Sequence, residues 1–337
     1  MLNCLKVLKC PIFPLRSPFL NLSSSPQVAI LGSTNWDISM FLPELPRPGH
    51  TVGAGRLVTN VGGKGANQAI ACHLAGVSSQ FVSCIGDDES AAKILQIFKT
   101  FKLDVASAFS IPDIHTGTAC IFVDARGQNC MGLTPGANSK LTRDVVQASQ
   151  HLIQDAKVLL MQLEIPIDSI MFATELAKRS GTLIILNPAP AQFLPESLYR
   201  MIDILTPNRS ELAILSGVST NSDDGLKRAS SAMLTKGVKR LIVTLGSDGV
   251  LLASEAGIKK YTAFKVNTVD TTAAGDVFNG YLAAELSNRL PEIDSEILNA
   301  SIARAIAASA ITVTKEGAIR SIPSGSEVTH FEKNYFR

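Results

Sequence analysis

Short runs of Val, Ile and Leu alternate along the chain with longer segments in which apolar residues recur every three or four positions. The apolar runs predict strands at Val28–Leu31, Phe81–Ile85, Lys157–Leu163, Leu183–Asn187, Ile202–Leu205, Arg240–Thr244 and Gly249–Ala253. The helical periods predict helices at Ala91–Phe101, Ile167–Ser180 and Asp223–Lys236. This alternation indicates an α/β fold with a mainly parallel central sheet and helices on both faces.

Two segments break the alternation, because no helical period separates their apolar runs. Residues Ile38–Thr59 and Thr116–Leu133 look like β-hairpins with Pro, Gly or Asn turns. No internal repeat and no low-complexity linker is present. We therefore expect one large domain over residues 27–330, with an extra β-layer inserted in it at about residues 38–59 and 116–133.

Residues 1–26 differ in composition from the rest of the chain. They carry Lys6, Lys9 and Arg16 but no acidic residue, and four prolines interrupt any helix. The composition partly resembles an organelle transit peptide, and a disordered leader accounts for it equally well. We expect this leader to take no part in catalysis.

Composition narrows the class of protein further. Apolar residues make up 46% and charged residues 18% of the 337 positions, as in globular proteins. Without the three basic residues of the leader, 28 basic side chains stand against 29 acidic ones, which argues against nucleic-acid or anionic-membrane binding. The six cysteines form no C-x-x-C pair, so we expect reduced thiols and a cytoplasmic location, with the nucleus as a further site and organelle import as the alternative.

The most informative stretch reads D-T-T-A-A-G-D, from Asp270 to Asp276. It follows a β-like run at Tyr261–Val266 and precedes a helix-like run at Val277–Leu286. Small residues at a helix N-terminus expose unpaired N–H groups and a partial positive charge, which suits an anion. A carboxylate in the first turn can accept the proton of a hydroxyl that attacks phosphorus. Helix capping is the competing interpretation of Asp276.

A second glycine-rich stretch reads G-G-K-G-A-N, from Gly62 to Asn67. It is no P-loop, because Val58 stands where that motif needs Gly and Gly65 where it needs Ser or Thr. Close backbone approach and the donor and acceptor of the Asn67 amide suit a ligand with several hydroxyls, such as a sugar. An ordinary strand-to-helix turn is the alternative.

Together the two stretches resemble the signatures of the ribokinase-like (PfkB) carbohydrate kinase family. Further matches follow in the family's order, at Gly32–Asp37, Gln162–Glu164, Asn187–Pro190, Thr206–Glu211, Thr244–Gly249 and Lys315–Pro323. The resemblance implies a three-layer sandwich with a small β-sheet lid made by the two hairpin segments, and a homodimer through that lid. Many members have Gly where this chain has Ala273, and the methyl group should be tolerated if the backbone stays at negative φ.

The resemblance also implies an activity, the transfer of a phosphoryl group from ATP to the O5 hydroxyl of a small sugar, with D-ribose expected. Asp276 would be the catalytic base, and the backbone N–H groups of Ala274, Gly275 and Asp276 would stabilise the transferred group. Asn208 and Glu211 would orient Mg²⁺, Glu211 through water. The other nucleotide contacts would come from Thr244, Leu245, Gly246, Ser247, Asp248 and Gly249.

Sugar contacts are implied at Asn35, Trp36, Asp37, Gly63, Lys64, Gly65, Ala66, Asn67, Glu164 and Asp276. For Asp37 and Glu164 a structural hydrogen bond is the alternative, although a position after a strand favours a ligand contact. A K⁺ site is implied as well. Its ligands would be the side chains of Asp270 and Ser321 and the carbonyls of Thr272, Thr312, Lys315 and Gly317.

Two other functions stay open at this point. The first is a kinase of the same family that acts on fructose, a nucleoside or another small polyol. The second is a catalytically silent protein that binds a sugar or a partner on the same fold. A catalytically silent protein is the less favoured of the two, because Asp276, the glycine turn, and Asn208 and Glu211 of the N-x-x-E motif are all present.

Overall fold

A ten-stranded sheet runs through the middle of the computed structural model, which describes residues 13–14, 27–104 and 107–335. In spatial order the strands are β1 (Phe13–Pro14), β6 (Ala108–Ser110), β5 (Ser79–Ile85), β2 (Val28–Leu31), β9 (Val158–Met161), β10 (Leu183–Leu186), β11 (Ile204–Leu205), β12 (Arg240–Thr244), β13 (Val250–Ser254) and β14 (Gly257–Tyr261). Every pair from β6 to β12 is parallel, and β1, β13 and β14 add antiparallel edges. The mainly parallel sheet expected from the sequence is confirmed.

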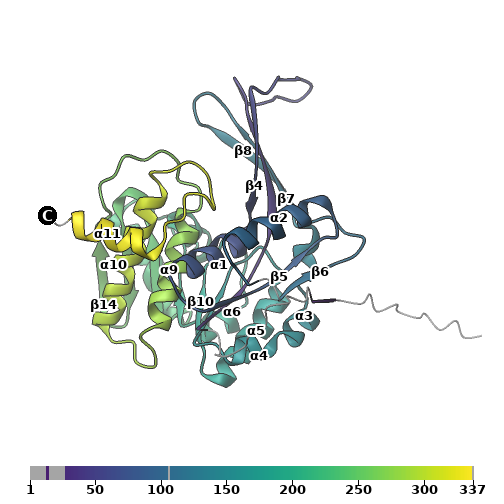
Figure 1. The fold of residues 1–337 in the computed structure, drawn as a ribbon. Helices are drawn as coiled ribbons and strands as arrows, with labels where there is room; N and C mark the ends of the chain where they lie inside the picture. The colour runs from purple at the N-terminus through teal and green to yellow at the C-terminus, as the bar shows by residue number, and fades with distance from the viewer. Residues whose placement is uncertain (1–12, 15–26, 105–106, 336–337) are drawn as a thin grey trace, which may run out of the picture.

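The sheet is buried on both faces because its strands are apolar at successive positions. In β2, Val28 and Ile30 belong to one hydrophobic core while Ala29 and Leu31 belong to the other. Helices α1 (Lys64–Leu74), α2 (Glu89–Thr100), α9 (Ala274–Ser287), α10 (Ser295–Thr312) and α11 (Gly325–Tyr335) cover the first core. The second is covered by α3 (Arg143–Ala148), α4 (Gln150–Gln154), α5 (Ile167–Ser180), α6 (Glu196–Met201), α7 (Arg209–Ser216) and α8 (Asp223–Thr235). The result is a three-layer sandwich (Figure 1).

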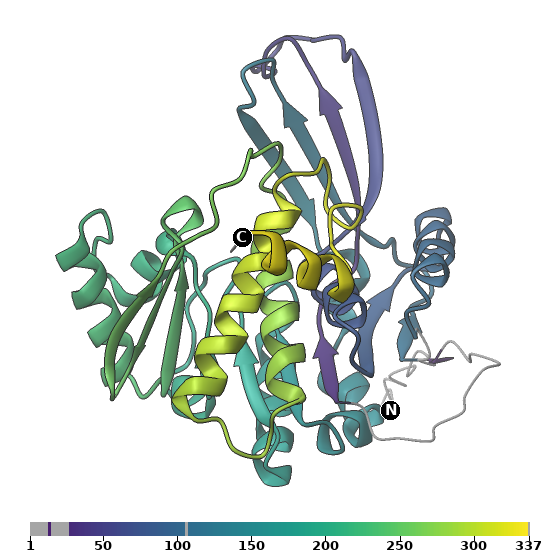
Figure 2. The ribbon, with the colours of Figure 1, turned by 60° about the vertical axis from the view of Figure 1, so that its left-hand side comes forward.

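A separate four-stranded sheet projects from this body (Figures 1 and 2). Its strands are β4 (Arg56–Gly62), β3 (Asn35–Phe41), β7 (Gly117–Val123) and β8 (Asn129–Thr134). Each segment predicted as a hairpin forms an antiparallel pair, and the parallel pairing of β3 with β7 joins the two. We call this sheet the lid.

One strand prediction is wrong. The run Tyr261–Val266 is not a strand beyond its first residue, because β14 covers Gly257–Tyr261 instead. Tyr261 pairs with Val250, the first residue of β13, so the chain beyond Tyr261 has no neighbouring strand to bond. Residues 262–268 are therefore irregular chain. They lead to Asp270–Asp276, the small-residue turn at the start of α9, which we call the anion turn.

The condition set for Ala273, a negative φ, is not met. Its φ is 62°, in the left-handed region, and it is the N-cap of α9. The leader prediction lies almost wholly outside the described residues, of which only Phe13 and Pro14 fall within it, as strand β1 at the sheet edge. In the part of the chain that the structure describes, no helix is both long and apolar enough to cross a membrane.

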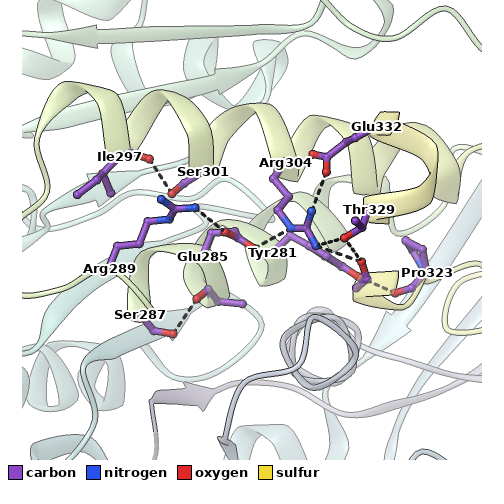
Figure 3. A network of polar contacts seen from close by, with 12 residues as sticks. Tyr281, Glu285, Ser287, Arg289, Ile297, Ser301, Arg304, Pro323, Thr329 and Glu332 are labelled. Atoms are coloured by element: carbon purple, nitrogen blue, oxygen red, sulfur yellow. Dashed lines mark hydrogen bonds and ion pairs between the residues drawn. The ribbon is translucent and has the colours of Figure 1, made fainter. Parts of the chain in front are cut away.

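Helix α11 had no clear sequence signal, because Val328 is its one fully buried apolar residue within the described chain. Besides the packing of Phe331 against the first core, polar contacts hold it (Figure 3). Arg304 of α10 bonds Glu285 of α9 at 2.8 Å and Glu332 of α11 at 2.7 Å. The hydroxyl of Tyr281 donates to the carbonyl of Pro323 at 2.8 Å, just before α11. These bonds join α9, α10 and α11.

Candidate active site

A cavity of about 210 Å³ opens where α9 begins, at the carboxyl ends of the parallel strands. This is where open α/β sheets bind their ligands. The residues around the cavity come from α1, from the segments that follow β10 and β11, from the end of β12, from α7, and from the turn before α9 and the start of that helix. They are Lys64, Asn187, Ala189, Thr206, Asn208, Glu211, Thr244, Thr271, Ala273, Ala274, Gly275, Asp276 and Asn279.

Asp276 lies in the first turn of α9 and is only 7% exposed. Its Oδ2 accepts a hydrogen bond from Asn67 Nδ2 at 2.9 Å, and its Oδ1 accepts one from Gln68 Nε2 at 3.0 Å. Both donors belong to α1, so the carboxylate is held across two helices rather than by the backbone of its own helix. This arrangement favours the chemical interpretation of Asp276 over the capping one.

A cluster of charged side chains surrounds Asp276 on the lid side. Glu164 Oε2 accepts hydrogen bonds from Ser33 Oγ at 2.5 Å and from the backbone N–H of Lys64 at 3.1 Å. Burial raises the pKa of Asp37 to about 7, and the charges of Glu164 and Asp276 add to the rise while Lys64 opposes it. Glu164 therefore makes the structural hydrogen bonds that were its alternative to a ligand contact.

Lys64 supplies the positive charge at the centre of this cluster. Burial by itself lowers the pKa of the ammonium, but four carboxylates outweigh burial and the pKa is raised. The carboxylates are Asp276, Glu164, Glu211 and Asp37. Lys64 therefore stays protonated, and a cation fixed beside the anion turn suits a phosphate ligand.

Two buried acceptors in this cluster have no hydrogen-bond partner among the described residues. They are Asp37 Oδ1 and Asn67 Oδ1. A buried oxygen without a donor is unfavourable by about 1–3 kcal/mol, so such atoms call for a ligand or water. Such acceptors fit a ligand that carries hydroxyl groups.

The glycines of the G-G-K-G-A-N stretch allow this close packing. Gly63 has a φ of 88°, which favours glycine, and a side chain at Gly62 would collide with the Asp37 carboxylate. Gly65 lies against the backbone of Gly32 and Ser33. Ala66 is fully buried, so its part is to pack α1 into the core.

Two of the predicted sugar contacts, Trp36 and Asn35, have other protein residues as neighbours. Trp36 lies on the opposite face of β3 from Asp37, packs against the core, and has the Lys93 ammonium 5.8 Å from its ring centre. Asn35 is buried, and its Oδ1 accepts a hydrogen bond from Asn138 Nδ2 at 2.7 Å. The structure thus keeps the Trp36 side chain apart from the cluster.

Asn138 is a site residue that sequence reasoning missed. Its Oδ1 accepts from the backbone N–H of Thr34 at 2.9 Å, and its Nδ2 donates to the Thr34 carbonyl at 3.2 Å. It therefore fixes the start of β3 and the orientation of Asn35. The turn residues Pro135 and Gly136 before it were the available signal.

The predicted nucleotide loop borders the other side of the cavity. Thr244 lines it and forms a bridge with Asn208, which connects this loop to the start of α7. Gly246 and Gly249 have positive φ values of 61° and 92°, and a short helical turn lies between them. Leu245 packs against the core, Ser247 is exposed, and Asp248 pairs with Arg209 at 3.1 Å.

Asn208 and Glu211 form a capping box at the start of α7. Asn208 Oδ1 accepts from the N–H of Glu211, and Glu211 Oε2 accepts from the N–H of Asn208, both at 2.8 Å. Glu211 therefore caps α7, and both residues also line the cavity. Burial raises the pKa of Glu211, the charge of Asp276 adds to the rise, and the Asn208 hydrogen bond and Lys64 oppose it.

The predicted cation loops meet beside the anion turn. Asp270 Oδ2 accepts from the N–H of Gly317 at 2.9 Å, while Oδ1 accepts from the N–H and the hydroxyl of Thr272. Burial acts to raise the pKa of Asp270, but these hydrogen bonds outweigh it and the pKa is lowered. Thr312 and Ser321, which precede and follow Gly317 in the chain, are both fully buried. The Ser321 hydroxyl donates to the Ala318 carbonyl.

Comparisons with known proteins agree with this geometry. Residues 25–325 match the family described as pfkB family carbohydrate kinase. The chain is 36% identical to the ribokinase of Haemophilus influenzae over 90% of its own length and 97% of that protein. It is 38% identical to the ribokinase of Staphylococcus aureus, covering 90% of this chain and 98% of that protein.

A solved structure extends the likeness from sequence to fold. The ribokinase of Arabidopsis thaliana complexed with ribose and ATP matches with a TM-score of 0.85 and 28% identity. The match covers 92% of this chain and 99% of that one. Since the family match spans nearly the whole described body, lid and anion turn included, this chain belongs to the pfkB family of carbohydrate kinases.

Proposed function

We propose that the protein transfers the γ-phosphoryl group of ATP to the O5 hydroxyl of D-ribose, giving D-ribose 5-phosphate and ADP. The observation that carries the proposal is the position of Asp276. Its carboxylate is buried between a polar cluster on the lid side and an anion-binding turn at the start of α9. Relatives named as ribokinases, at 36% and 38% identity over nearly their full length, support ribose as the acceptor.

The chemistry follows from this placement. Asp276 takes the proton of the O5 hydroxyl as that oxygen attacks the γ-phosphorus, and the bond from phosphorus to ADP breaks. The carboxyl group then returns its proton to solvent. Backbone N–H groups of Gly275 and Asp276 would stabilise charge on the phosphoryl group, and the Lys64 ammonium would add to this, whereas the N–H of Ala274 already donates to the Thr271 carbonyl at 3.3 Å.

The buried acceptors support a small sugar as the substrate. Asp37 Oδ1 and Asn67 Oδ1 would each accept a ribose hydroxyl and so gain the partner that they lack. A nucleoside would need an apolar or aromatic wall for its base. The residues around the cavity include no aromatic side chain, and Trp36 faces away from Asp37.

We assign Mg²⁺ to the Asn208 and Glu211 end of the cavity. Only Oε2 of Glu211 takes part in the capping box, so its second oxygen can hold a water of the ion's shell. Magnesium keeps several waters and needs few carboxylates, which fits one Glu beside one Asn. When bound, the ion shields the charge of the phosphates.

We assign K⁺ to the loops joined by Asp270. Backbone carbonyls of Thr272, Thr312, Lys315 and Gly317, with the side chains of Asp270 and Ser321, would supply its oxygen ligands. The loop begins four residues before Ala274, so an ion that orders it would order the anion turn too. We expect higher activity in K⁺ than in Na⁺ buffer, and equal rates in chelated K⁺-free buffer would contradict the assignment.

We also propose a homodimer formed through the lid. Leu57, Met131 and Leu133 of its strands are 57%, 65% and 48% exposed, which is a large apolar surface for a projecting sheet. A partner lid would cover these side chains. Light scattering should give the mass of a dimer, and a Met131→Glu variant should shift the population to monomer.

A coupled ADP-release assay tests the proposed function against ribose, 2-deoxyribose, fructose and adenosine. We expect the highest kcat/KM for ribose. The matched blank is Asp276→Asn, which keeps the shape of the side chain and loses its basicity, and should turn over at least about 100-fold more slowly while still binding ribose. A higher kcat/KM for adenosine or fructose would overturn ribose as substrate, and near-normal turnover of the folded variant would remove Asp276 as the base.

A further inference from the structure

We propose that Gln68 and Gln162 form a relay that positions the base Asp276. Gln68 Nε2 donates to Asp276 Oδ1 at 3.0 Å and to Asn187 Oδ1 at 3.2 Å. Gln68 Oε1 accepts in turn from Gln162 Nε2 at 2.7 Å. Both glutamines are fully buried. The inference rests on the proposed function. It assigns a role to two buried glutamines that the mechanism above does not use.

The donor and acceptor pattern fixes the orientation of each amide. An ionised carboxylate only accepts, so the amino group of Gln68 must face Asp276, and its carbonyl oxygen must face Gln162. Asn187 Nδ2 donates to the carbonyl of Thr206 at 2.9 Å, which turns Asn187 Oδ1 towards Gln68. With Asn67 on the other oxygen, the carboxylate is held at both ends and has one orientation.

The two glutamines act through Asp276 and not on the substrate. Asp276 and Asn187 line the cavity, whereas Gln68 and Gln162 stand behind them. Gln162 follows β9 and Gln68 lies in α1, so the relay ties the base to the central sheet rather than to α9 alone. Because the rate of phosphoryl transfer depends on the placement of the reacting groups, we expect this anchoring to affect kcat.

Gln68→Met and Gln162→Met test the relay, alone and combined, with methionine chosen for its similar shape. We expect Gln68→Met to lower kcat about 10- to 100-fold, as losing an outer partner of a reacting group does, while the KM for ribose stays within about twofold. Gln162→Met should lower kcat less, and should have no further effect when Gln68→Met is already present. The matched control is Ser230→Ala, which removes a buried hydrogen bond to Leu226 in α8 and should change neither constant.

Unchanged kcat in folded Gln68→Met, or effects of the two variants that add, would overturn the relay. If Gln68→Met does not fold, Gln162→Met carries the test. Gln162 Oε1 has no partner among the described residues, so its removal should be tolerated. Crystal structures of the variants give a readout that needs no activity, since the relay requires Asp276 to turn in Gln68→Met. An unmoved carboxylate refutes the relay even if the wild-type protein rejects ribose.

Discussion

At the scale of single residues, Ala273 shows how the anion turn is built. A φ of 62° brings the Cβ of an L-residue close to the following carbonyl oxygen, at a cost of roughly 1–2 kcal/mol. Ala273 keeps this conformation as the N-cap of α9, where the chain must turn sharply so that Ala274 and Gly275 border the cavity. The strain therefore lies at the point where the phosphoryl group is expected to bind.

We expect Ala273→Gly to stabilise the protein by about 0.5–1 kcal/mol, because the relief of strain exceeds the added freedom of the unfolded chain. Chemical denaturation would measure the change in unfolding free energy. Ala274→Gly is the matched control, since the same atoms are removed one residue later, inside α9. It should destabilise by up to about 1 kcal/mol, and a loss of stability in both variants would contradict the strain at Ala273.

Asp37 makes a second prediction at this scale. Its pKa of about 7 in the folded protein lies above the ordinary value of 3.8, because burial disfavours the charged form. The protonated side chain is compatible with folding below pH 4, and stability is lost as the pH rises from there through about 7. Asp37→Asn removes this ionisation and should gain stability over the wild type across that range, by on the order of 2 kcal/mol at pH 8.

Denaturation of both proteins at pH 5 and pH 8 checks this prediction. Glu44→Gln is the control, since Glu44 is exposed and its removal should give the same difference at both values. If the stability of Asp37→Asn relative to wild type fails to rise with pH, Asp37 is not the group that burial penalises.

At the scale of elements, Arg304 decides where α11 lies. Its guanidinium bonds Glu285 and Glu332, and it also donates to the Gly325 carbonyl and to Thr329 (Figure 3). The Arg304 side chain is 22% exposed and that of Glu285 is 13% exposed, so screening by solvent is limited. The network adds to the ring contacts that Phe331 and Tyr335 of α11 make with Phe264.

We expect Arg304→Met to lower the unfolding free energy by about 2–3 kcal/mol, since it removes the Glu332 ion pair and leaves Glu285 only the more distant Arg289. A fall in Tm would show it. Arg289→Met is the control, because Arg289 reaches the same Glu285 at 3.7 Å from a more exposed position and should matter by about 0.5 kcal/mol or less. Equal effects of the two variants would mean that the network does not anchor α11.

At the scale of the whole molecule, the parallel sheet assembles the site from distant parts of the chain. Asn67 and Asp276 are 209 residues apart in sequence and share a hydrogen bond. They meet because α1 and α9 pack against each other on one face of the sheet, and each residue lies in the first turn of its helix. The central parallel strands of this sheet begin in sequence with β2.

Deletion of residues 1–26 should therefore leave the fold and the kinase activity unchanged. The described part of this leader is the two-residue edge strand β1, whose loss should change stability by about 1 kcal/mol or less. Thermal unfolding and ribose turnover of the shortened chain would test this. A large fall in Tm would show that the leader packs on the body, and imaging of a leader fusion would separately decide organelle import.

The sequence by itself determined the features that depend on local pattern. Continuous apolar runs such as Val28–Leu31 suit only a strand buried on both faces, and hairpin turns without a helical period suit only antiparallel pairs. The small residues before Asp276 marked the anion turn, since only they let a helix N-terminus lie open. These features need no knowledge of what each segment packs against.

The tertiary structure alone decided which side chains meet. Trp36 and Asp37 are neighbours in sequence but lie on opposite faces of β3, and the choice of face depends on how the lid joins the body. Asn138, Gln68 and Gln162 gained their roles from partners 94 to 208 residues away, which no local pattern encodes. The positive φ of Ala273 followed from the docking of α9, because packing of the helix outweighed the preference of one residue.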